Sequence, residues 1–80
     1  MVNWQDYIVS DKAILGGKPT IKGTRLSAAF ILERLASGWS EEEVLENYPS
    51  LTQIHLQAVF AYALTWVEDG LLSTPTAKRA

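Results

Sequence analysis

Helix start signals and helix stop signals alternate three times in the C-terminal two-thirds of this sequence, and this alternation constrains the fold most. Serine and threonine cap helix N-termini, whereas glycine ends a helix in a left-handed turn and proline cannot continue one. The spacing predicts three short helices, over about residues 28–37, 41–48 and 53–68. The six signals, in chain order, are Ser27, Gly38, Ser40, Pro49, Thr52 and Gly70.

The start of the second helix is the clearest local signal. Ser40 is followed three residues later by Glu43, which is the spacing of a capping box. Glu41, Glu42 and Glu43 also place three carboxylates where the positive end of the helix dipole stabilises them. Capping therefore accounts for these carboxylates, and we expect no metal there.

The third helix is apolar on nearly every side from Leu56 onward. Such a helix is typical of the core of a large protein, and 80 residues cannot build a core of that size. We therefore expect part of the helix surface to meet a second copy of the chain or another partner. The residues assigned to this dimer or partner interface are Phe60, Tyr62, Trp66 and Val67.

The residues before Ser27 predict a loose β-arm or hairpin. Tyr7-Ile8-Val9 and Thr20-Ile21 are β-prone, and glycine-containing turns lie between and after them. The expected fold is mainly α, a three-helix homeodomain-like helix-turn-helix unit preceded by a short N-terminal β-arm. It forms one domain, with the arm over residues 1–26, the helical core over 27–72 and a frayed tail over 73–80.

Charge is distributed unevenly along the chain. Residues 1–26 hold four bases against two acids, a net of +2, whereas residues 27–72 hold one arginine against seven acids, a net of −6. The chain is therefore a basic N-terminal segment attached to an acidic helical body.

Few side chains are available for catalysis. The chain has one histidine, His55, and no cysteine, so we expect neither an enzyme nor a disulfide framework. The turn Gly16-Gly17-Lys18 lacks the spacing of a phosphate-binding loop, and Pro19 removes a backbone donor. We expect no cofactor, no membrane contact and a cytoplasmic location, because no signal peptide or long apolar segment is present.

Nucleic-acid binding has specific support. A helix-turn-helix consists of two helices, which here would be the helices over 41–48 and 53–68. The N-terminal residues of the later helix face base edges, and glutamine can pair with adenine. The phosphate contacts would come from the arm, because residues 52–69 contain no lysine or arginine. Three helices packed without any DNA contact remain the alternative. The candidate DNA-binding residues are Thr52, Gln53, His55 and Gln57 for bases, and Lys18, Lys22 and Arg25 for phosphates.

Two longer motifs resemble a known family. The segment DYIVSDKAILGGKPTIKGTR and the later ERLASGWSEEEVLENYP, followed by LT, are similar to the domain-of-unknown-function 433 family, DUF433, over about residues 4–69. The resemblance implies a homeodomain-like helix-turn-helix fold and, for some members, a VapB-like antitoxin that neutralises a PIN-like ribonuclease toxin. One departure is Gln53-Ile54-His55, where members usually have a proline and acidic residues.

Two functions follow as hypotheses. The first is an antitoxin-like, DNA-binding regulator of a bacterial toxin–antitoxin system that acts as a homodimer. The second is a protein-interaction module that binds a toxin or another partner without DNA. Salt-dependent DNA binding and co-purification with a partner distinguish the two.

Overall fold

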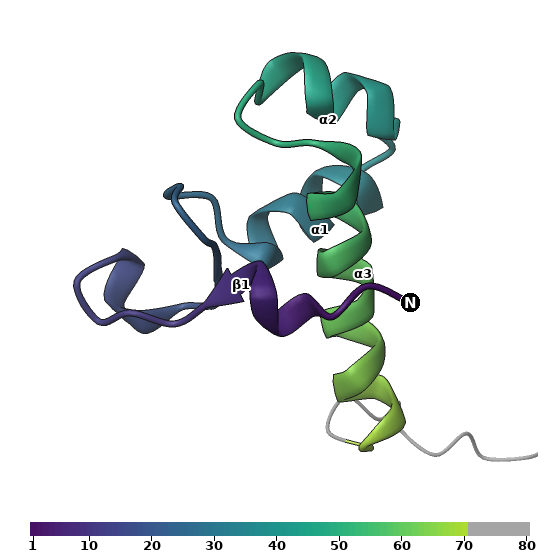
Figure 1. The fold of residues 1–80 in the computed structure, drawn as a ribbon. Helices are drawn as coiled ribbons and strands as arrows, with labels where there is room; N and C mark the ends of the chain where they lie inside the picture. The colour runs from purple at the N-terminus through teal and green to yellow at the C-terminus, as the bar shows by residue number, and fades with distance from the viewer. Residues whose placement is uncertain (71–80) are drawn as a thin grey trace, which may run out of the picture.

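A computed structural model describes residues 1–70, in which three helices follow a small N-terminal hairpin (Figure 1). The expected mainly α fold with an N-terminal hairpin is confirmed. The frayed tail expected over residues 73–80 lies outside the described residues. In chain order the elements are η1 (Trp4–Asp6), β1 (Ile8–Val9), η2 (Leu15–Gly17), β2 (Thr20–Ile21), α1 (Ala28–Ala36), α2 (Glu41–Asn47) and α3 (Gln53–Glu68).

The predicted capping residues start α1 and α2. The Ser27 hydroxyl accepts a hydrogen bond of 3.0 Å from the backbone N–H of Phe30. At α2, the Ser40 hydroxyl accepts from the Glu43 N–H at 3.1 Å, and the Ser40 N–H donates back to the Glu43 carboxylate at 2.8 Å. Each contact satisfies a backbone group that has no partner within its own helix.

The hairpin is part of the core rather than a loose arm. β1 and β2 pair antiparallel, with Ile8 opposite Ile21 and Val9 opposite Thr20. Ile8 and Ile21 are both buried, and the backbone N–H of Ala28 donates to the Pro19 carbonyl at 2.9 Å, which ties the hairpin to α1. A two-stranded hairpin is marginal alone in water, so the helices must supply its stability.

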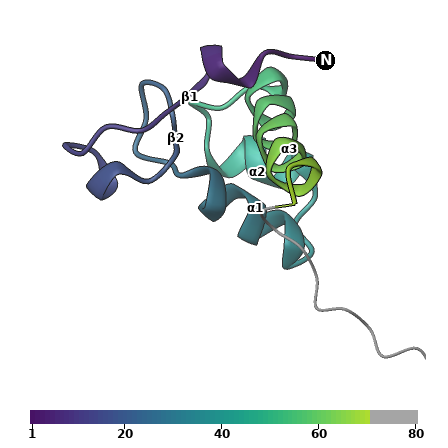
Figure 2. The ribbon, with the colours of Figure 1, turned by 90° about the horizontal axis from the view of Figure 1, so that it is seen from below.

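The hydrophobic core lies where the three helices and the hairpin meet. In the view of Figure 2, α1 lies on one side of α3 and the N-terminal segment lies on the other. No helix within residues 1–70 combines the length and the apolar character needed to cross a bilayer. The largest fully buried side chains are Ile21, Ile31, Leu56, Val44, Val59 and Thr20.

The N-terminal turn η1 holds the chain start against α3, and the sequence analysis did not predict it. The Trp4 ring packs edge-on against Tyr62, with 4.9 Å between ring centroids. Its indole Nε1–H donates to the Thr65 hydroxyl at 3.1 Å, and that hydroxyl donates in turn to the Ala61 carbonyl. These contacts fix the N-terminal segment along the second half of α3.

Candidate interaction surfaces

One face of α3 points away from the core and changes character along its length. Its N-terminal half carries Gln53 and Gln57, both exposed. From the middle of the helix onward it carries Phe60, Leu64 and Val67, which are 43%, 38% and 54% exposed. Because residues three and four apart share a helix face, these three side chains form a continuous stripe, here called the apolar stripe.

A hollow of about 340 Å³ adjoins the apolar stripe where the N-terminal segment passes α3. Met1, which is 98% exposed, adds to the apolar surface at this place. The hollow is open to solvent and has no buried polar group that would orient a small ligand. It is lined by Met1, Val2, Gln57, Phe60, Ala61 and Leu64.

The predicted interface residues divide between two sides of α3. Phe60 and Val67 belong to the apolar stripe, whereas Tyr62 is half-buried against Trp4. Trp66 is 37% exposed, and its ring lies edge-on to Tyr62 at 5.9 Å. Leu64 was not among the predicted interface residues, although its spacing from Phe60 and Val67 places it between them on the stripe.

The N-terminus of α3 lies beside the acidic start of α2. The Gln53 side-chain amide donates to the Glu41 carboxylate at 2.7 Å, so this candidate base-reading group already has a partner. Glu42 and Glu43 follow in the same exposed turn of α2. A DNA backbone that approached this end of α3 would meet the three carboxylates. Residues 35–70 supply no lysine or arginine to offset them.

The His55 side chain caps the start of its own helix, α3. Its Nδ1 accepts a hydrogen bond of 2.9 Å from the backbone N–H of Thr52 and lies 3.1 Å from the Thr52 hydroxyl. The ring thus occupies the N3 position of a capping box at the start of α3. The half-buried ring also packs edge-on against Tyr7 at 5.8 Å.

The candidate phosphate-binding residues fall into two places. Lys18 and Arg25 are exposed and line one pocket of about 280 Å³ at the N-terminus of α1. Lys22 follows β2, and its backbone N–H donates to the Tyr7 carbonyl at 2.8 Å. Since the Tyr7 ring contacts His55, Lys22 is linked through Tyr7 to the start of α3.

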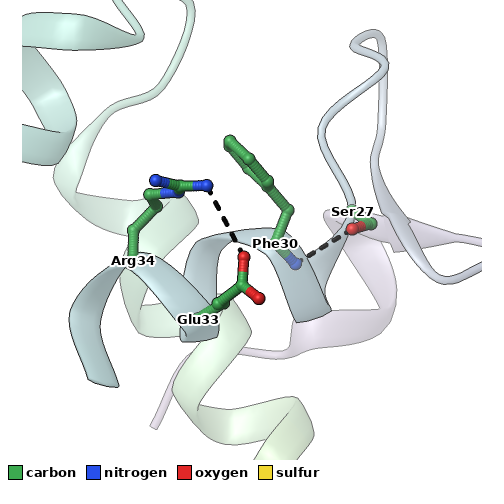
Figure 3. Close-up of polar contacts among 4 residues, drawn as sticks. All are labelled: Ser27, Phe30, Glu33 and Arg34. Carbon is green, nitrogen blue, oxygen red and sulfur yellow. Dashed lines mark hydrogen bonds and ion pairs between the residues drawn. The ribbon is translucent and has the colours of Figure 1, made fainter. Parts of the chain in front are cut away.

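Arg34, the one arginine or lysine of residues 27–72, packs against two aromatic rings. Its guanidinium lies 4.7 Å from the centre of the Phe30 ring and 5.5 Å from the Trp39 ring. It also forms an ion pair of 3.5 Å with Glu33, one turn after the Ser27 hydroxyl caps the Phe30 N–H (Figure 3). The cation therefore joins α1 to the segment before α2 instead of adding to an exposed basic surface.

Comparison with known proteins assigns the chain to a family. The family model described as protein of unknown function (DUF433) matches residues 8–63, which include the hairpin, α1, α2 and most of α3. This chain belongs to the DUF433 family.

Two relatives support the same assignment. A crystal structure of a DUF433 member protein from Anabaena variabilis is 29% identical, with a TM-score of 0.74 over 81% of this chain and 64% of that one. An uncharacterized protein of Sinorhizobium fredii, y4eO, is 36% identical over 61 residues, which are 74% of this chain. This DUF433 chain spans 28% of the length of that relative.

Proposed function

We propose that this DUF433 protein is an antitoxin-like regulatory module that acts by binding protein through the apolar stripe of α3. The single observation that carries the proposal is the exposure of Phe60, Leu64 and Val67 as one continuous surface. The family resemblance supplies the class of partner, a PIN-like toxin. Among the residues that the structure describes, the side chains lining this surface include no nucleophile and no general acid or base.

The stripe differs from ordinary apolar exposure on a small protein. Single exposed hydrophobic residues are common on monomers, whereas contiguous apolar surface marks binding sites. Here Phe60 and Leu64 of the stripe line a hollow whose walls include Met1 and Val2. Aromatic anchors beside a concave apolar surface are typical of protein interfaces.

Electrostatics around α3 favours protein over DNA as the ligand of this helix. DNA affinity depends on neutralised phosphates, and residues 52–70 contain no lysine or arginine. Glu41 lies against Gln53, so the helix start is negatively charged. This negative charge repels DNA phosphates, whereas it does not repel a protein surface of neutral, lysine or arginine side chains.

Co-expression with the product of the neighbouring gene tests the proposal. The native chain is expected to co-purify with that product, and the Leu64→Glu variant is expected to lose it, because a carboxylate would have to be desolvated in the interface. The matched control is Ala36→Glu, which adds the same charge at an exposed site on α1. Equal retention by the native chain and both variants would contradict the proposal.

DNA binding is a second candidate function, favoured by the shared pocket of Lys18 and Arg25. Two cations beside one helix N-terminus can contact the same phosphate backbone. With Lys22 they would provide the charge, while Thr52 and Gln57 stay exposed toward solvent. This candidate is the DNA-binding form of the antitoxin hypothesis.

A mobility shift on DNA upstream of the gene, measured at several salt concentrations, tests this second function. Replacing Lys18 and Arg25 by glutamine is expected to lower the slope of log affinity against log salt by about 1.8, since each phosphate contact contributes about 0.9. Lys12→Gln, which removes an exposed charge outside that pocket, is the control. An absence of any shift at low salt would rule out this function.

A further inference from the structure

We infer that the protein that covers the apolar stripe has lysine or arginine side chains at both ends of an apolar contact surface. The inference rests on the proposed function, because it names the chemistry of the partner that binds this face of α3. Its basis is the position of two carboxylates, those of Glu41 and Glu68, at opposite ends of the stripe.

The first carboxylate is held at the stripe by Gln53. Gln53 lies four residues before Gln57, which lies three before Phe60, so this glutamine continues the face of the stripe toward the start of α3. Its side-chain amide donates to the Glu41 carboxylate at 2.7 Å, which fixes a negative charge at this end of the face. Gln53 and Glu41 are both exposed, so a protein bound to the stripe meets that charge.

The second carboxylate belongs to the last turn of α3. Glu68 is exposed and lies four residues after Leu64, so it borders the other end of the stripe. The helix has 16 residues from Gln53 to Glu68, and at 1.5 Å per residue its two ends lie about 22 Å apart. The two charges therefore flank the apolar side chains from either end.

Neither carboxylate is neutralised within the part of the chain that the structure describes. The one ion pair in residues 1–70 joins Arg34 to Glu33, and residues 35–70 contain no lysine or arginine. A partner with a neutral or acidic rim would remove water from both carboxylates without supplying opposite charge, which costs free energy. Lysine or arginine at the two matching positions removes this cost and steers the encounter.

The rate of association with the product of the neighbouring gene tests the inference, because charges at the rim of an interface act mainly on this rate. Glu41→Gln and Glu68→Gln remove the charges, and glutamine at position 41 can still accept from Gln53. At about 0.1 M salt, charges more than about 10 Å away are largely screened. There the double variant is expected to associate about tenfold more slowly than the native chain. At about 1 M salt the two are expected to associate equally fast.

The matched control is Asp11→Asn, which removes an exposed carboxylate far from the stripe. The segment between β1 and β2, where Asp11 is found, extends away from α3 in both views (Figures 1 and 2). Asparagine can still accept the hydrogen bond that Asp11 receives from the Ala13 N–H. This variant is expected to associate at the native rate, and circular dichroism is expected to show the same helix content for all variants.

The outcomes separate the inference from the proposed function. A double variant that associates as fast as the native chain, while Leu64→Glu abolishes binding, would reject the basic partner and leave the proposed function standing. A loss of rate that Asp11→Asn shares would also overturn the inference, since net charge rather than the ends of the stripe would then set the rate. A native chain that does not bind the product would reject the proposed function and the inference with it.

Discussion

At the residue scale, single hydrogen bonds engage side chains that the sequence analysis treats as available for DNA bases. His55 and Gln53 stand at the start of α3, yet one caps the Thr52 N–H and the other binds Glu41. The Thr52–His55 contact spans three residues and follows the capping-box spacing, so it could have been predicted. The Gln53–Glu41 contact depends on how α2 and α3 meet, which local spacing does not determine.

Replacing His55 tests its capping role. His55→Ala is expected to lower the free energy of unfolding by about 0.5–1.5 kcal/mol, since the net contribution of such a hydrogen bond is of that size. His55→Gln is expected to lose less, because glutamine can accept from the same N–H in a capping box. Urea denaturation followed by circular dichroism measures both variants. Equal destabilisation would show that the contact with Tyr7, rather than the cap, is what His55 supplies.

Trp4 provides a second test at this scale. Trp4→Phe keeps an aromatic ring against Tyr62 and removes the indole donor to Thr65. The expected loss of unfolding free energy is about 1 kcal/mol. Thr65→Val removes the acceptor, and the double variant is expected to lose less than the sum of the single losses. Additive losses would mean that the hydrogen bond contributes nothing to stability.

At the element scale, the ends of the helices were predictable and their neighbours were not. Ser27 and Ser40 cap α1 and α2 through contacts three residues apart, so the sequence alone contains both partners. Trp4 and Thr65 are 61 residues apart, and no local pattern joins them. Local pattern also does not predict which side of α3 is buried, because a helix that is apolar all round has no amphipathic period.

The α2 helix depends strongly on its cap. It has seven residues, and isolated helices of that length are marginal even with favourable sequences. Ser40→Ala is expected to lower the free energy of unfolding by about 1–2 kcal/mol, which is the upper part of the range for an N-cap. Ser37→Ala, at the C-cap of α1, is the comparison and is expected to change stability less. Thermal unfolding at equal protein concentration provides the measurement.

At the scale of the whole molecule, polar and apolar surfaces are segregated. Lysines and arginines gather on the N-terminal segment, whereas carboxylates gather on α2 and at the C-terminal end of α3. The apolar stripe lies on α3 between these two groups of carboxylates. The composition, 48% hydrophobic in 80 residues, predicts surplus apolar surface. It does not predict which residues carry it, because Tyr62 turns toward Trp4 while Leu64 faces solvent.

The mass of the complex in solution tests the central claim that protein covers the apolar stripe. In a mixture with the product of the neighbouring gene, sedimentation equilibrium at micromolar concentration is expected to show a complex heavier than the 8.9 kDa chain for the native protein and for Ala36→Glu. Leu64→Glu is expected to sediment apart from that product, with unchanged helix content. A native chain that sediments apart from the product, or a Leu64→Glu variant that stays in the complex, would contradict the account.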